Sequence, residues 1–153
     1  MNERIIESEE CLKEGSGYLA DRFPEFSYAI DMTGSLNLRR QPDGFSQLLS
    51  AIVSQQLSVA AANSIWSRLK SARLIGPRKI SSASDEELAA AGLSRQKIRY
   101  ARALADSKIN YRKLRGMAND EVIAELTQVS GIGSWTAEIY TMFSLGRADV
   151  FAP

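Results

Sequence analysis

Histidine is missing altogether from this 153-residue sequence. Because histidine is the side chain that most often moves protons near neutral pH and the commonest metal ligand, its absence excludes Ser-His-Asp and Cys-His catalytic sites. Any chemistry must therefore use carboxylates, hydroxyls, lysine or a cofactor.

Cysteine and long apolar runs are scarce as well. Cys11 is the only cysteine, which excludes a disulfide within the chain, a cysteine-based zinc site and an iron–sulfur cluster. No run of about 18 apolar residues predicts a membrane span, and the acidic start MNERIIESEE lacks the apolar core of a signal peptide. We therefore expect no membrane partner and a cytoplasmic, reducing compartment.

Strand signals are almost absent, because no segment alternates apolar and polar residues over six positions. Helix signals are frequent instead, and residues 44–55 carry a stripe at helical spacing: Phe45, Leu48, Leu49, Ile52 and Val53. Candidate helix starts are Asp43, Ser58, Ser84 with Glu87 in a capping box, Ser94, Asn119 or Asp120, and Ser134. The sequence predicts an all-α protein of roughly eight to ten helices, in one domain or in two small lobes around a cleft.

The charge is unevenly distributed although its net value is only +1. Residues 1–14 hold five acidic and two basic residues, whereas residues 95–115 hold eight basic residues and one acidic residue. Such a basic stretch predicts a polyanionic partner for one face of the protein. A solvated helix face would carry the same charges, so charge alone leaves both interpretations open.

The most specific local pattern is LTQVSGIGSWTA at residues 126–137. Gly131 and Gly133 permit a tight turn between two helices, with Ile132 between them as an apolar plug. The next helix begins at once, so its unpaired N–H groups and positive dipole end favour an anion such as a phosphate. An ordinary helix–helix turn that uses two glycines is the simpler alternative for the glycines alone.

The whole string resembles the hairpin of the helix-hairpin-helix base-excision DNA glycosylases. Three further collinear blocks resemble the same family: GFSQLLSAIVSQQLSVA at residues 44–60, AAGLSRQK at 90–97 and LGRADVFAP at 145–153. The branch that fits best is 3-methyladenine DNA glycosylase II. The resemblance implies N-terminal helices in residues 1–35 and a glycosylase domain over residues 36–153 that is cut short at its C-terminal end relative to the family.

That family flips a damaged base out of duplex DNA and hydrolyses its N-glycosidic bond. The resemblance implies this base-excision repair reaction on alkylated purines, with damaged duplex DNA as the partner and a monomeric protein. It implies that Gly131 and Gly133 bind a phosphate through their amides and that Ser134 and Thr136 add hydroxyl contacts. It also implies a monovalent cation, Na⁺ or K⁺, held by the backbone carbonyls of Thr127, Val129 and Ile132.

Two side-chain features match the family's base-flipping machinery. Gln56 matches the wedge that fills the hole left by the flipped base, and Gln55 would contact neighbouring bases. Trp135 would line the base pocket, where its indole face attracts the positive charge of an alkylated purine. Without the resemblance, the glutamines would be a solvated helix end and Trp135 a core aromatic. Ile139 stands where some relatives have a second pocket aromatic, which puts the pocket chemistry in doubt.

The family's catalytic aspartate typically follows the proline of this last block by two residues, so it would lie just beyond Pro153. Asp149 belongs to the block itself and is not that residue, so the catalytic residue is unknown. We therefore expect the 153 residues alone to be inactive or nearly so. The Schiff-base lysine of bifunctional relatives is also missing, since its slot falls near Gln128, and this predicts a monofunctional glycosylase.

Two other functions fit parts of the same pattern. A non-catalytic helix-hairpin-helix module would use the hairpin only as a phosphate clamp and would bind intact and abasic duplexes equally. A helical protein–protein adaptor would show no salt-dependent binding to DNA at all.

Overall fold

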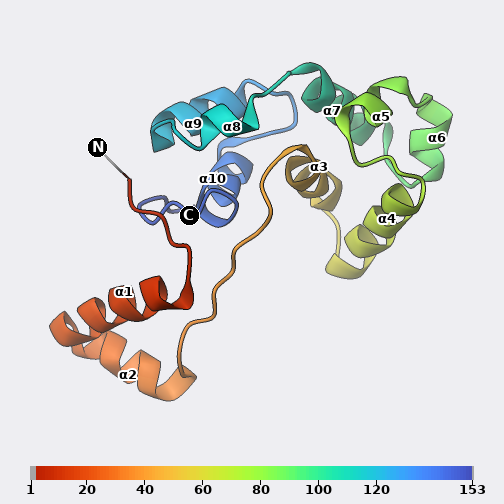
Figure 1. Ribbon diagram of the computed structural model, residues 1–153. Coiled ribbons are helices and arrows are strands. Elements are labelled where there is room, and N and C mark those ends of the chain that lie inside the picture. Colours follow the sequence, from red (N-terminus) through yellow and green to blue (C-terminus); the bar gives the residue numbers. More distant parts are fainter. Residues whose placement is uncertain (1–2, 153) are drawn as a thin grey trace.

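The computed structural model describes residues 3–152 and, within that range, contains only helices and loops. The helices are α1 (Glu9–Arg22), α2 (Pro24–Thr33), α3 (Phe45–Ser54), α4 (Val59–Ser71), α5 (Pro77–Ser82), α6 (Asp85–Ala90), α7 (Arg95–Asp106), α8 (Tyr111–Leu114), α9 (Asn119–Thr127) and α10 (Ser134–Phe143). The only strand-like pairing among these residues is a single bridge between Ile5 and Arg147. The all-α prediction is therefore confirmed (Figure 1).

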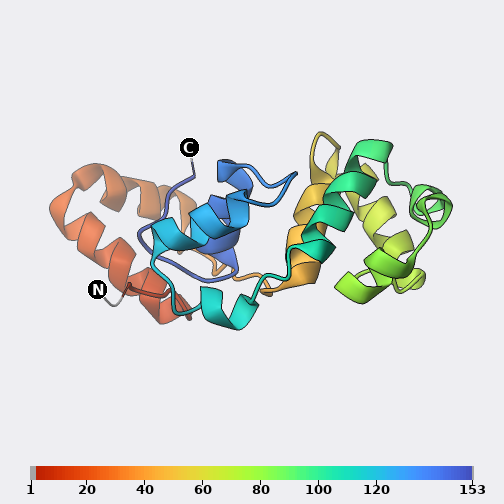
Figure 2. The ribbon, with the colours of Figure 1, turned by 90° about the horizontal axis from the view of Figure 1, so that it is seen from above.

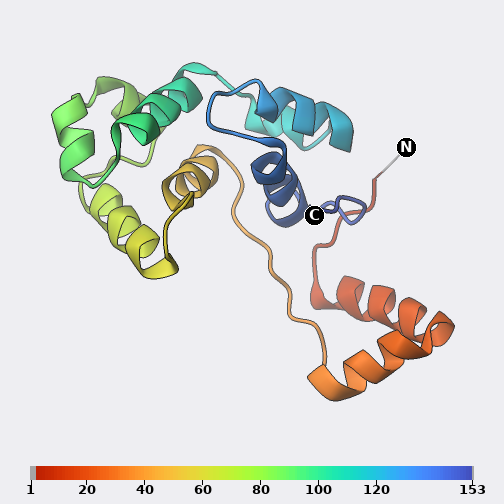
Figure 3. The ribbon, with the colours of Figure 1, turned by 180° about the vertical axis from the view of Figure 1, so that it is seen from behind.

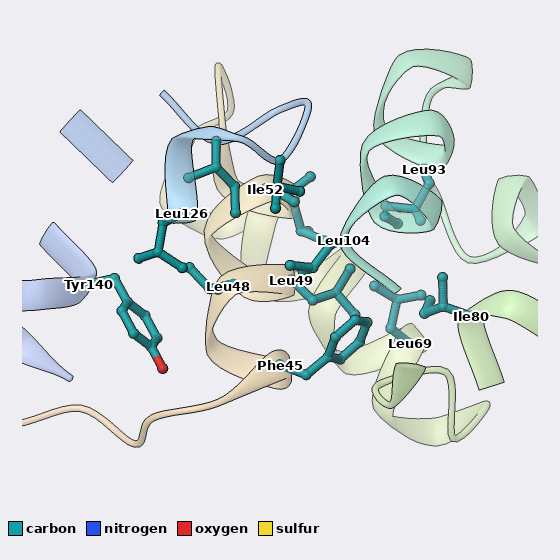
Figure 4. Close-up of a cluster of buried hydrophobic side chains, with 14 of the residues drawn as sticks. Phe45, Leu48, Leu49, Ile52, Leu69, Ile80, Leu93, Leu104, Leu126 and Tyr140 are labelled. Atoms are coloured by element: carbon teal, nitrogen blue, oxygen red, sulfur yellow. The ribbon is translucent and has the colours of Figure 1, made fainter. Parts of the chain in front are cut away.

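Helix α3 lies between two groups of helices and packs against both. Its predicted stripe is buried, with Leu48, Leu49 and Ile52 fully inaccessible. In Figure 4, Leu126 and Tyr140 lie on one side of α3, and Leu69, Ile80, Leu93 and Leu104 lie on the other. Each fully buried Leu or Ile contributes about 1.5–3 kcal/mol relative to an exposed one, so α3 holds together the lobe of α4–α7 and the lobe that contains α9 and α10.

Local capping signals explain where several helices begin. The side chains of Ser58, Ser84 and Ser94 accept hydrogen bonds from the backbone N–H groups at the start of α4, α6 and α7, and Glu87 completes the capping box of α6. Helix α9 begins at Asn119, as expected.

Two expected caps are wrong. The N-cap of α10 is Gly133, so Ser134 is the first helical residue and does not cap. The N-cap of α3 is Gly44, whose N–H donates to the Tyr140 hydroxyl at 2.8 Å. Asp43 instead forms an ion pair with Arg115 at 2.7 Å, across 72 residues of sequence. A distant partner thus outcompetes the local backbone for the Asp43 carboxylate.

Helices α1 and α2, which account for the helices expected in residues 1–35, form a hairpin at one end of the molecule, opposite α5 and α6 (Figure 2). Neither helix contains a buried residue. An extended connection then runs from Gly34 to α3 (Figure 3). The segment before α1 is tied to the C-terminal segment, since Ile6 N–H donates to the Gly146 carbonyl at 2.7 Å and Arg147 pairs with Glu3 at 2.7 Å.

Candidate functional site

Residues 128–133, called the hairpin below, connect α9 to α10 in a tight turn. The Ile132 N–H donates to the Val129 carbonyl at 3.0 Å, which closes the turn. Ile132 is 4% exposed and Val129 is 6% exposed, so the two apolar side chains anchor the hairpin in the core, as predicted for Ile132. Gly131 has φ +95°, a value that favours glycine.

The polar backbone at the end of the hairpin is left unpaired. Within residues 3–152, the N–H groups of Gly131, Gly133 and Ser134 donate no hydrogen bond. No side chain caps α10, and its first turn has no acidic residue. Gly133 and Ser134 are exposed, and Gly131 is half-buried. Unpaired N–H groups and the positive end of the helix dipole together make a site for an anion.

Helix α7 packs against the hairpin through Tyr100. A Cβ atom on Gly131 would lie 2.4 Å from Cγ of Tyr100, so only glycine fits against this ring. The Tyr100 hydroxyl in turn accepts a hydrogen bond from Nε2 of Gln96 at 2.6 Å. Figure 2 shows the hairpin extending from α9 and α10 toward α3 and α7.

Gln55 and Gln56, called the glutamine bend below, end α3 beside the hairpin. Gln55 Nε2 donates to the Gly131 carbonyl at 2.8 Å, so this amide links the bend to the hairpin. Gln56 is exposed and has φ 57°, the left-handed conformation. The structure therefore brings the bend and the hairpin together. It engages the Gln55 side chain with protein and leaves the Gln56 side chain exposed, and the DNA contacts expected of both residues stay predictions.

A half-buried lysine from α7 reaches the same bend. Lys97 Nζ donates to the carbonyls of Val53 and Gln55 at 2.6 and 2.8 Å. Burial lowers the pKa of Lys97, because the ammonium has lost part of its water. Sequence reasoning gave Lys97 no role, since its partners lie more than forty residues away.

A cavity of about 400 Å³ lies between α3, α10 and the segment that leads into α3. Its lining residues are Arg39, Gln41, Gln47, Ala51, Thr136, Ile139, Tyr140, Phe143 and Ser144. They include no carboxylate, and no cluster of three or more His, Cys, Asp or Glu residues suited to a metal occurs in residues 3–152. Burial raises the pKa of Tyr140 to about 12, so its hydroxyl stays protonated at neutral pH.

Two predicted site residues occupy unexpected places relative to this cavity. Trp135 is the second residue of α10 and is 58% exposed, but it is not among the lining residues. Thr136 is only 7% exposed and lines the cavity, whereas Ser134, two residues earlier, is exposed. Ile139, the position where an aromatic occurs in some relatives, does line the cavity.

Gln47 is a cavity residue that sequence reasoning missed. It lies four residues before Ala51, so the two share one face of α3. The four-residue spacing of Gln47 and Ala51 is visible in the sequence, so the position of Gln47 could have been predicted from it. Arg39 and Gln41 also line the cavity, but they lie in no helix, so no periodic pattern in the sequence could predict their position.

Three of the eight basic residues in 95–115 are engaged with protein. Arg102 binds Asp85 and three backbone carbonyls, Arg115 pairs with Asp43, and Lys97 binds the end of α3. The other five are exposed and form no ion pair within the described chain: Arg95, Arg99, Lys108, Arg112 and Lys113. These five side chains are available to phosphates.

Comparison with known proteins places the chain in a family. Residues 49–151 match the sequence model of the HhH-GPD superfamily base excision DNA repair proteins. The DNA-3-methyladenine glycosylase 1 of Schizosaccharomyces pombe is 36% identical over 115 residues, which are 69% of this chain and 50% of that protein. The chain therefore spans half the length of this relative.

Solved structures agree with the sequence match. The DNA-3-methyladenine glycosidase of Bacillus halodurans has a TM-score of 0.78 at 35% identity, over 99% of this chain and 70% of that one. The 3-methyladenine DNA glycosylase of S. pombe, solved in complex with abasic DNA, has a TM-score of 0.77 at 29% identity, over 91% of this chain and 73% of that one.

Proposed function

Because the chain belongs to the HhH-GPD superfamily of base excision DNA repair proteins, we propose that it acts in the excision of alkylated purines from damaged duplex DNA. The observation that carries this proposal is the set of unpaired amides at Gly131, Gly133 and Ser134 beside an exposed Gln56. An anion site next to a wedge is what flipping one nucleotide requires. The similarity to 3-methyladenine glycosylases supports alkylated purines as the substrate class.

In this proposal, the hairpin holds a phosphate beside the lesion. The three amides bind the phosphate, and the Ser134 hydroxyl is exposed beside them. The phosphate contact expected for Thr136 stays a prediction, and burial of this residue argues for a role in the cavity.

A monovalent cation at the hairpin fits the donor chemistry. Carbonyl oxygen suits hard cations, and the Val129 carbonyl, which accepts one hydrogen bond from Ile132, keeps a second lone pair. We propose that this carbonyl and those of Thr127 and Ile132 would hold Na⁺ or K⁺, which would neutralise part of the phosphate charge.

Base flipping costs a few kcal/mol of unstacking, which a wedge offsets by filling the hole. We assign the wedge to Gln56, because its side chain is exposed at the end of α3. The exposed indole of Trp135 can stack on the extruded base, and its electron-rich face favours a positively charged alkylpurine. A cationic base is already a good leaving group, so an acid to protonate it matters less.

Hydrolysis itself passes through an oxocarbenium-like transition state that a carboxylate stabilises. No carboxylate lines the cavity. We therefore assign this role to no residue in 3–152. We expect the 153-residue chain to release no methylpurine, or almost none, from alkylated DNA. Ready release of methylpurine by the chain would mean that a carboxylate within residues 3–152 is catalytic.

The same observation favours a second candidate, a non-catalytic DNA-binding module. The two proposals differ in their response to an abasic analogue, which spares the protein the cost of unstacking a base. A base-flipping protein should bind a duplex with a tetrahydrofuran abasic analogue at least about ten-fold more tightly than the intact duplex, whereas a simple phosphate clamp should bind both alike. Fluorescence anisotropy with the two labelled duplexes measures this ratio.

The remaining aspects of the proposal are the strand-cleavage chemistry, the oligomeric state and the compartment. No lysine stands at the hairpin's start, and Gln128 occupies that position, so we propose a monofunctional enzyme. Trapping a covalent DNA adduct with borohydride would contradict this.

We further propose a monomer in the cytoplasm. No helix in residues 3–152 is long and apolar enough to cross a membrane.

A further inference from the structure

The end of α3 is capped by a residue from another helix. The last carbonyls of a helix lack intrahelical partners and attract cations. Helix α3 has no basic residue in its last turn. Lys97 of α7 supplies the cation instead, through hydrogen bonds to the carbonyls of Val53 and Gln55.

The residue that follows these carbonyls is held in a strained conformation. Gln56 has φ 57°, which residues other than glycine adopt only where the surrounding structure determines it. The Gln55 carbonyl belongs to the peptide bond between Gln55 and Gln56. The hydrogen bond from Lys97 therefore holds the backbone directly before the strained residue. Neighbouring contacts on both sides of Gln55 thus fix the direction in which the Gln56 side chain leaves α3.

The contacts form a closed ring through three elements. Lys97 binds the Gln55 carbonyl, the Gln55 amide binds the Gly131 carbonyl, and Gly131 lies against the Tyr100 ring. Lys97 and Tyr100 are three residues apart on α7 and therefore share one face of that helix. Helix α7 thus holds the glutamine bend and the hairpin in one relative position.

We propose that Lys97 is a positioning residue for base flipping: by holding the glutamine bend against α7, it sets the spacing between the Gln56 wedge and the phosphate held by the hairpin. This inference rests on the proposed function. Lys97 touches neither phosphate nor base in this scheme, so binding to an intact duplex should not depend on it. The preference for a duplex in which a base is missing should depend on it, because only that complex uses both the wedge and the hairpin.

The test compares K97M with the wild-type chain and with K70M, a control at an exposed lysine of α4. Anisotropy gives the affinities for the intact and the abasic-analogue duplex, and 2-aminopurine opposite the abasic site reports insertion of the wedge. We expect K97M to lose about five- to ten-fold of the preference for the abasic duplex, with a matching loss of the 2-aminopurine signal. Affinity for the intact duplex should be unchanged, and K70M should behave as the wild type does.

A merely structural role would give a different result. In that case K97M would unfold more easily but keep its preference for the abasic duplex, which would overturn the proposal. If K97M does not fold, two other variants replace it: K97Q loses the charge but keeps an amide N–H₂ group that can donate, and K97R retains the charge and several donors. We then expect the preference to rank wild type, K97R and K97Q in falling order, and equal preferences would overturn the proposal. A wild-type chain that binds both duplexes equally would refute the proposed function itself.

Discussion

The close approach of Gly131 to Tyr100 allows the effect of one substitution to be worked out. In G131A, the added Cβ would lie 2.4 Å from Cγ, 2.6 Å from Cβ and 2.7 Å from Cδ2 of Tyr100. These atoms lie near the backbone of α7 and cannot swing away as the end of a flexible chain could. Either the ring or the hairpin must therefore move.

Two costs add in G131A. Alanine at a positive φ costs about 1–2 kcal/mol, and overpacking a filled site costs about 1–3 kcal/mol. The expected loss in the free energy of unfolding is therefore about 2–5 kcal/mol, a large part of the roughly 5–15 kcal/mol typical of a folded domain. Urea unfolding followed by circular dichroism measures it. Binding to the abasic-analogue duplex should weaken as well, because the shift displaces the unpaired amides.

Gly133 provides the matched control in the same hairpin. A Cβ there meets nothing within 4 Å, and its φ of −86° suits any residue. Since serine is a good N-cap, G133S should be as stable as the wild type to within about 1 kcal/mol. Its hydroxyl would accept a hydrogen bond from the N–H of Trp135 or Thr136. This places a side chain beside the amides that we assign to phosphate, so DNA binding should fall without loss of stability. If G131A unfolded at the same urea concentration as the wild type, the argument from steric clash would be refuted.

Two further predictions concern the indole and the N-terminal ion pair. W135A should lose about three- to thirty-fold of any binding preference for a cationic alkylpurine over a neutral purine analogue, while W135F keeps part of it; an equal preference in W135A would remove Trp135 from the site. E3Q should lower the free energy of unfolding by about 1–3 kcal/mol, because the Arg147 side chain is only 5% exposed and pairs with Glu3. Unchanged urea midpoints in E3Q would show that the N-terminal segment does not stabilise the C-terminal one.

Local signals predicted α3, α4, α6, α7, α9 and α10 and most of the core, whereas α5 and α8 had no such signal. The stripe from Phe45 to Val53 is buried because a 3.6-residue period places these side chains on the faces of α3 that pack against its neighbours. Ser84 caps α6 because its partner is three residues away. Asp43 failed as a cap because Arg115, invisible in the local sequence, binds its carboxylate.

The site was predictable only in part, and the reason is again distance along the chain. Glycine spacing and the resemblance located the hairpin and the glutamines. Neither indicated that Gln55 binds the Gly131 carbonyl, 76 residues away. Nor could they show that Trp135 does not line the cavity. The direction of a side chain at the second position of a helix is known only when the helix itself has been placed relative to its neighbours.

The arrangement of α3 has a consequence for how the site tolerates change. One helix supplies the core of both lobes through Leu48, Leu49 and Ile52, part of the cavity wall through Gln47 and Ala51, and the glutamine bend at its end. Because a packed core transmits small displacements, a shift of α3 along its axis would move Gln56 relative to the hairpin without any change in a residue of the proposed DNA-binding site. Lys97 and the Gln55 amide oppose that shift from two sides. In the proposed function, the spacing between the wedge and the hairpin is therefore set by partly buried contacts of α3 and α7, whereas affinity for the phosphate is set by exposed amides and basic side chains.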